Sequence, residues 1–132
     1  MEPIKDNNYK IGTIIKHLKR GSIYEIINVG YIESTLTPAY SYRCLSDGVI
    51  WHRPITEVED TNRFIKMETA IIFMNTESKS GLTVFDNDRI TPIAIVRSVS
   101  SKGSKIELFD EHIINKINNG TKHSYTVSCK GV

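Results

Sequence analysis

The residues best suited to chemistry lie around one tryptophan and one arginine, in the run Trp51-His52-Arg53-Pro54. Alternate side chains of an extended strand point to opposite faces, so we expect Trp51 and Arg53 to share a face and His52 to lie on the other. A strand containing Tyr42 and Arg43 precedes this run, across a predicted turn at residues 46–48, and should pair with it. An aromatic plane beside a guanidinium suits a nucleobase or a phosphate.

A structural role for the same residues is the competing interpretation. Trp51 could fill the core of a small barrel, and Arg53 could form an ion pair with Glu57 or Glu59.

A second group of basic residues surrounds the first predicted turn. It consists of Lys16, His17, Lys19 and Arg20. These side chains could hold the phosphates of a nucleic acid or a nucleotide. They could equally form a solvated turn that discourages strand edges from pairing with other chains.

The second half of the chain offers two weaker candidates. The run Asp86-Asn87-Asp88 has oxygen ligands for a metal, but its spacing is not that of an EF-hand, and a polar turn is the preferred interpretation. Arg89 and Arg97 are eight positions apart in one predicted strand and could share a face that binds an anion.

Catalytic and cofactor motifs are missing from the sequence. The four histidines have no zinc-ligand spacing, and there is no nucleophile elbow, phosphate-binding loop or dinucleotide fingerprint. We therefore expect a protein that is not an enzyme and that carries no metal and no cofactor.

Composition and charge bear on the partners and the cellular location of the protein. The 132 residues carry a net charge of +2, from 17 basic and 15 acidic side chains spread evenly along the chain, which does not favour nucleic-acid binding. No apolar run is long enough for a membrane span and the N-terminus does not resemble a secretory signal, so a cytoplasmic protein without a membrane partner is expected. Cys44 and Cys129 are expected to be free thiols.

The pattern of elements predicts a mainly β protein. Isoleucine occurs 20 times, against five leucines and three alanines, which favours strands over helices. Five short strands are predicted at 9–18, 22–29, 40–45, 49–53 and 63–66, with a bulge at Gly30 and a loop at 35–39. Tight turns between them indicate a small barrel-like unit over residues 1–66.

A second β-rich unit is predicted over residues 67–132. Its strands are expected at 68–75, 82–85, 89–99, 105–109 and 124–129. A short helix is predicted at 111–118, capped by Asp110, with Ile113, Ile114 and Ile117 on one face. Exposed strand edges in this unit would permit a homo-oligomer.

The first unit resembles a family of small bacterial and phage proteins of unknown function. The shared pattern is Gly-x-x-Tyr, then Asp-Gly-x-hydrophobic-Trp-x-Arg-Pro, then Arg-Phe, and it covers residues 9–64. The pattern also includes a basic strand that ends in a His or Lys and a later Tyr-Arg strand. Its positions here are Gly12, His17, Lys19, Gly21, Tyr24, Gly30, Tyr42, Arg43, Asp47, Gly48, Trp51, Arg53, Pro54, Arg63 and Phe64. The chain departs from the pattern at Val58, where an aromatic residue is common. The resemblance implies a small β-barrel of phage or mobile-element origin, and it implies no reaction.

Three functions are consistent with these observations. The first is a non-catalytic binding protein, phage- or mobile-element-encoded, that inhibits a host or defence protein by occupying it. The second is a protein that sequesters a small signalling nucleotide in a pocket of arginines and aromatic residues. The third, ranked last because the charge is balanced, is a weak nucleic-acid-binding module.

Overall fold

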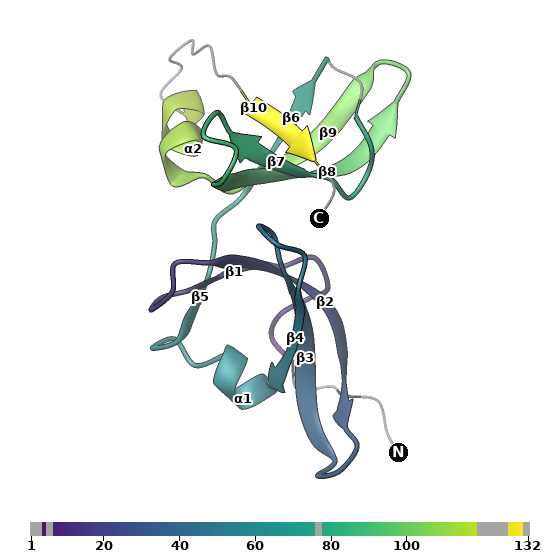
Figure 1. Cartoon of the computed structure of the whole chain (residues 1–132), viewed down its shortest axis with the longest axis vertical. Coiled ribbons are helices and arrows are strands. Elements are labelled where there is room, and N and C mark those ends of the chain that lie inside the picture. The colour runs from purple at the N-terminus through teal and green to yellow at the C-terminus, as the bar shows by residue number, and fades with distance from the viewer. Residues whose placement is uncertain (1–3, 5–6, 76–77, 119–126, 131–132) are drawn as a thin grey trace. The chain divides into compact units, whose positions relative to one another are not determined.

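The computed structural model describes residue 4 and residues 7–75, 78–118 and 127–130. It confirms a mainly β protein, built from two antiparallel five-stranded sheets, one short helix and a single helical turn (Figure 1). The chain divides into two compact units, Met1–Met67 and Glu68–Val132.

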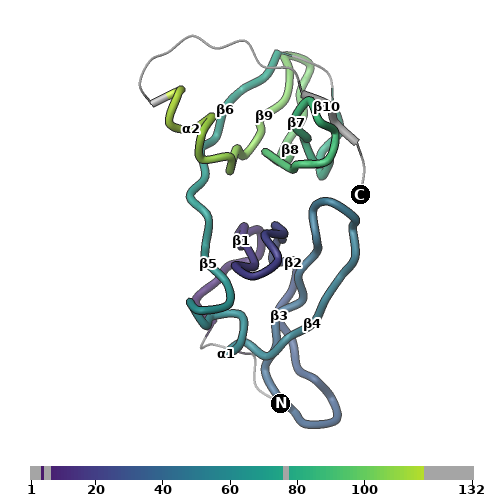
Figure 2. The backbone as a smooth tube through the Cα atoms, turned by 60° about the vertical axis from the view of Figure 1, so that its left-hand side comes forward, coloured from purple at the N-terminus to yellow at the C-terminus, as the bar shows by residue number. Residues whose placement is uncertain are grey.

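The first unit is a sheet with strand order β4-β3-β2-β1-β5. Its elements are β1 (Ile14–His17), β2 (Ile23–Ile32), β3 (Thr37–Cys44), β4 (Ile50–Pro54), α1 (Ile55–Val58) and β5 (Phe64–Lys66). β4 and β5 form the two edges, and the described strand pairs do not close the sheet into a barrel. The tube view follows the chain from β4 through α1 to β5 (Figure 2). Pro54 ends β4 because it has no N–H group for further pairing.

Turns and strand limits in this unit follow local geometry. Gly21 and Gly48 have φ values of 74° and 77°, and both predicted turns are confirmed. β1 begins only at Ile14, because Gly12 at φ 95° interrupts the strand predicted from residue 9. The predicted bulge at Gly30 is wrong: Gly30 pairs with Ala39, and the register shifts between residues 26 and 28. The loop predicted at 35–39 is therefore shorter, since β3 begins at residue 37.

One face of the sheet carries an aromatic core. The rings of Tyr24, Tyr42 and Phe64 meet edge to face, with centroids 5.1 to 6.4 Å apart. From α1, Ile55 and Val58 are buried in the same cluster. Their i, i+3 spacing places both side chains on one side of the helical turn. We call this side of the sheet the inner face.

The second unit has strand order β10-β7-β8-β9-β6. Its elements are β6 (Ala70–Met74), β7 (Thr83–Asp86), β8 (Pro92–Ser100), β9 (Gly103–Leu108), α2 (Glu111–Asn118) and β10 (Val127–Lys130). Asp110 caps α2 as predicted, because its Oδ1 accepts a hydrogen bond from the Ile113 amide at 3.0 Å. Ile113, Ile114 and Ile117 share one face of α2 as predicted; Ile113 and Ile114 are buried, whereas Ile117 is 44% exposed.

Two predictions in this unit fall partly outside the described residues. The predicted last strand at 124–129 is described only as β10, and the side chain of Cys129 lies outside the described part. The other cysteine, Cys44, is a buried free thiol.

In the described parts of the chain, no helix has the length and apolar character needed to cross a membrane.

Candidate functional site

Strand register assigns the tryptophan cluster to two faces. Tyr42 pairs with Trp51, and Arg43 pairs with Ile50 one position away. Directly paired side chains lie on the same face, so Trp51 joins the buried Tyr42 on the inner face. Arg53, two residues after Trp51, shares that face as predicted. Arg43 does not, because the pleat places it on the opposite side.

His52 also lies on the outer face, as its alternation with Trp51 predicted. It pairs with Ser41, whose hydroxyl lies 2.7 Å from His52 Nδ1. The outer face of this hairpin is therefore a separate surface from the one that carries Trp51.

Trp51 is not the core residue that the structural interpretation proposed. Its side chain is 45% exposed, whereas its strand partner Tyr42 is 4% exposed. β4 is an edge strand, so Trp51 has a neighbouring strand on one side only. The tryptophan is an exposed aromatic surface that continues from a buried aromatic core.

Arg53 has the ion pair that the structural interpretation predicted, together with an aromatic contact. Its Nη1 lies 3.6 Å from Oε1 of Glu57, and its guanidinium carbon lies 5.8 Å from the centroid of Phe64. A guanidinium at this distance from a ring is within the range of a cation–π contact. The 3.6 Å separation is longer than a hydrogen bond, so the ion pair is loose.

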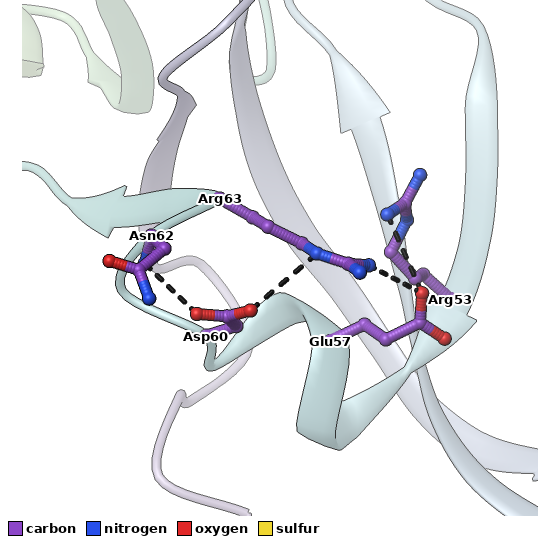
Figure 3. Close-up of polar contacts among 5 residues, drawn as sticks. All are labelled: Arg53, Glu57, Asp60, Asn62 and Arg63. Atoms are coloured by element: carbon purple, nitrogen blue, oxygen red, sulfur yellow. Dashed lines mark hydrogen bonds and ion pairs between the residues drawn. The ribbon is translucent and has the colours of Figure 1, made fainter.

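Arg63 competes for the same carboxylate oxygen (Figure 3). Its Nη1 lies 2.7 Å from Oε1 of Glu57, and its Nε lies 3.5 Å from Oδ2 of Asp60. The backbone N–H of Asn62 in turn donates a hydrogen bond to Oδ1 of Asp60 at 3.0 Å. Arg63 is therefore the principal partner of Glu57, and Arg53 is the secondary one.

The His17 side chain, at the end of β1, lies on the inner face. It pairs with Phe64 across β1 and β5, and the two rings meet edge to face at 4.9 Å. The Arg20 backbone amide donates to His17 Nδ1 at 3.1 Å. In the neutral ring Nδ1 is then the acceptor, so the proton resides on Nε2.

Four cations gather around this imidazole. Burial lowers the pKa of His17, and the charges of Arg20, Arg53, Lys19 and Arg63 lower it further. These cations come from three segments: the β1–β2 turn, the end of β4 and the residue before β5. With His17, Tyr42 and Phe64, they form what we call the basic–aromatic cluster.

Tyr42 supplies a hydroxyl to this cluster. Burial raises its pKa, while the charges of Arg53 and Arg20 act in the opposite direction. Arg20 and Arg53 thus both act on one phenol, although they are far apart in the sequence. Two carboxylates, Glu57 and Asp60, oppose the four cations through the ion pairs described above.

Two predicted site residues of the first unit, Lys16 and Arg43, lie on the outer face of the sheet. Lys16 pairs with Ile23 and Ile65, one position out of phase with His17, and so lies on the outer face. Arg43 forms an ion pair at 2.9 Å with Glu25, whose side chain is 9% exposed. The sequence prediction grouped these residues with their neighbours, whereas strand alternation separates them.

The predicted anion site at Arg89 and Arg97 does not form on a strand. Arg89 has φ 63° and lies in the turn before β8, which begins only at Pro92. Arg97 forms an ion pair with Glu107, with Nε 2.8 Å from Oε1. The two arginines therefore belong to different elements and do not share the face of one strand.

Asp88 organises the predicted polar turn. Its Oδ1 accepts hydrogen bonds from the amides of Ile90 and Thr91 at 2.8 and 2.9 Å, and its Oδ2 accepts from the Thr91 hydroxyl at 2.7 Å. These bonds, led by the Thr91 amide, lower the pKa of Asp88. The carboxylate is used by the turn itself. Among the described residues, no three His, Cys, Asp or Glu side chains are grouped to hold a metal.

Arg63 and Phe64 are the members of the cluster that the site prediction omitted. Both appear in the Arg-Phe pair of the family resemblance, which was the available signal. The chain matches no protein-family model, and no curated protein and no solved structure was found to match it.

Proposed function

We propose that this chain is a non-catalytic binding protein that acts by occupying a protein partner. The supporting observation is the exposure of Trp51, which is 45% accessible on the same face as the buried aromatic core. Tryptophan, tyrosine and arginine are the residues that most often dominate binding energy at protein interfaces. Trp51 and Arg53 share one face, with Tyr42 beside them.

The edge position of β4 adds support for a macromolecular partner. Trp51 on this edge strand and Val49, which precedes β4, are 45% and 44% exposed. Apolar residues on an edge strand are costly in water and suit burial against another protein. The cations of the basic–aromatic cluster would then face acidic groups of that partner.

The biological setting is proposed from the family resemblance alone. Residues 9–64 resemble small bacterial and phage proteins, and this supports a phage- or mobile-element-encoded inhibitor of a host or defence protein. No catalytic role is assigned to any residue of the cluster.

Affinity capture from the producing cell tests this proposal. Tagged protein should retain a specific partner, and Trp51→Ala and Arg53→Ala should each reduce its recovery at least tenfold. His52→Ala is the matched control, because His52 lies on the opposite face of the same strand. Circular dichroism must show that all three variants fold. Equal recovery with folded Trp51→Ala, Arg53→Ala and wild-type proteins would contradict the proposal.

A second candidate function is the sequestration of a small nucleotide. The observation that favours it is the position of Arg53 over Phe64, next to His17 and on the same face as the exposed Trp51. Native mass spectrometry of the purified protein tests it and also reports whether the chain forms the expected homo-oligomer. A retained mass of a few hundred daltons with absorbance at 260 nm would support the nucleotide. A clean multiple of the 15.0 kDa chain would count against it.

A further inference from the structure

We infer that the basic–aromatic cluster is a binding site for a phosphate monoester, held mainly by the guanidinium groups of Arg20 and Arg53. This inference rests on the second candidate function and specifies its ligand chemistry. The ligand class that fits best is a nucleoside monophosphate, with its phosphate on the arginines and its base against Trp51.

The positive charges of the cluster are only partly balanced by carboxylates. Arg63 is engaged by Glu57 at 2.7 Å and by Asp60 at 3.5 Å, so both nearby carboxylates are already used by one arginine. The only ion pair of Arg53 among the described residues is the loose one with Glu57, and its other contacts are with the uncharged side chains of Phe64 and Tyr42. Within the parts of the chain that the structure describes, no ion pair involves the Arg20 side chain. Two guanidinium groups thus remain for an added dianion.

Packing against the core holds several groups of the cluster in place. Phe64 is completely buried, and it supports both Arg53 above its ring and His17 at its edge. The Arg20 backbone is tied to His17 through Nδ1. Groups held in place by a packed core lose little conformational entropy on binding, which favours affinity.

The hydrogen-bond donors of the cluster suit a phosphate group. Planar guanidinium groups match phosphate oxygens in two-point hydrogen bonds. The Nε2–H of neutral His17 and the hydroxyl of Tyr42 are uncharged donors in the same cluster. The Arg20 backbone is hydrogen-bonded to His17, and Arg53 lies over the Phe64 ring that His17 contacts, so charged and neutral donors lie close together.

The position of Trp51 favours a nucleotide over a bare anion as the ligand. Trp51 lies two residues before Arg53 on the same face, which is about 7 Å along a strand. Exposed aromatic rings stack on bases of any sequence. A base stacked on Trp51 would therefore lie within reach of a phosphate bound at Arg53.

Titration of the full-length protein with AMP, inorganic phosphate and adenosine tests this inference. Trp51 is the only tryptophan, so quenching of its fluorescence reports stacking directly, and calorimetry reports binding of phosphate alone. We expect AMP to bind at least tenfold more tightly than either phosphate or adenosine. Arg20→Ala and Arg53→Gln should each weaken AMP binding tenfold or more.

Lys16→Ala is the matched control. It removes a positive charge from the neighbouring outer face, so a general electrostatic effect would weaken binding equally in this variant. Equal losses in Lys16→Ala and Arg20→Ala would overturn the site. Undetectable binding of both AMP and phosphate to the folded wild-type protein would overturn it as well.

A different outcome would correct the ligand class. If phosphate and AMP bind equally and only the Arg20 and Arg53 variants lose binding, the nucleotide is overturned and the phosphate must come from another source, such as a phosphorylated partner side chain. Capture of a protein partner is measured separately with Trp51→Ala. Failure of phosphate binding with intact, Trp51-dependent capture would leave the first proposed function standing.

Discussion

The guanidinium of Arg53 lies over the ring of Phe64, 5.8 Å from its centroid. The His17 ring packs edge-on against the same phenyl ring, and Tyr24 and Tyr42 contact it as well. One buried side chain therefore joins the hydrophobic core to the charged groups of the candidate site.

Replacing Phe64 should affect both stability and binding. Phe64→Ala should lower the free energy of unfolding by about 3–5 kcal/mol, because it removes a buried ring and leaves a cavity. Phe64→Leu fills more of the space and should cost less, while still releasing Arg53 and His17. Urea unfolding followed by Trp51 fluorescence measures both variants. An unchanged unfolding midpoint in Phe64→Ala would contradict this account of the core.

Tyr40 and Glu59 should hold the chain that precedes β1. The buried Tyr40 hydroxyl donates to Glu59 Oε2 at 2.5 Å and accepts from the Tyr9 amide at 2.9 Å. The amide and side chain of Asn8 donate to the same carboxylate at 2.9 and 2.8 Å. Burial is the largest cause that raises the pKa of Tyr40, followed by its hydrogen bond with Glu59.

Tyr40→Phe should therefore lower the free energy of unfolding by about 1–3 kcal/mol, because the Tyr9 amide loses its acceptor. Hydrogen exchange at the Tyr9 amide should accelerate more than exchange in β3. Unaltered exchange at Tyr9 in a folded variant would show that this hydroxyl does not hold the segment.

His17 should make stability depend on pH below neutrality. Burial and four nearby cations lower its pKa in the folded protein below the ordinary value of 6.5, so folding favours the neutral ring. This stabilisation is fully present above pH 6.5 and is lost as pH falls through the lowered pKa of the folded state.

The matched variant is His17→Gln, whose side-chain oxygen can still accept from the Arg20 amide. The wild-type protein should lose stability relative to His17→Gln between pH 7 and pH 5. Urea unfolding at several pH values measures this difference. An NMR titration in which His17 has a pKa at or above 6.5 would contradict the prediction.

Two strand glycines should differ in how well they tolerate alanine. Gly103 has φ +136°, and an added Cβ would meet the Met74 carbonyl oxygen and the Phe73 ring. Gly30 has no atom within 4 Å of such a Cβ. Gly103→Ala should lower stability by about 1–3 kcal/mol, whereas Gly30→Ala should change it by less than about 1 kcal/mol. Thermal unfolding by circular dichroism compares them, and equal transition temperatures would refute the predicted strain.

Local patterns were sufficient for several features. The turn at Gly48, the placement of Trp51 and Arg53 opposite His52, and the Asp110 cap of α2 follow from residues within a few positions of one another. Strand alternation alone would also have separated Lys16 from His17. Such features depend on backbone conformation over short distances, which the residue types control.

Exposure and long-range partners could not be predicted in the same way. Periodicity placed Trp51 on a face but did not indicate how completely neighbouring strands cover it, and its exposure reflects the edge position of β4. In the same way, the helical pattern placed Ile117 on the apolar face of α2 but did not indicate that it is 44% exposed. Residue preference predicted a strand from residue 89, but Arg89 has a positive φ and β8 begins only at Pro92.

The amino-acid sequence by itself determined the mainly β class, the main turns and the alternation of side chains along β4, because these depend on neighbouring residues. Only the tertiary structure decided that Arg20, Arg53 and Arg63 gather around His17 and Phe64, and that Arg43 pairs with Glu25 instead. The physical reason is that strand order and register determine which distant side chains meet, and these result from packing the whole sheet around its aromatic core.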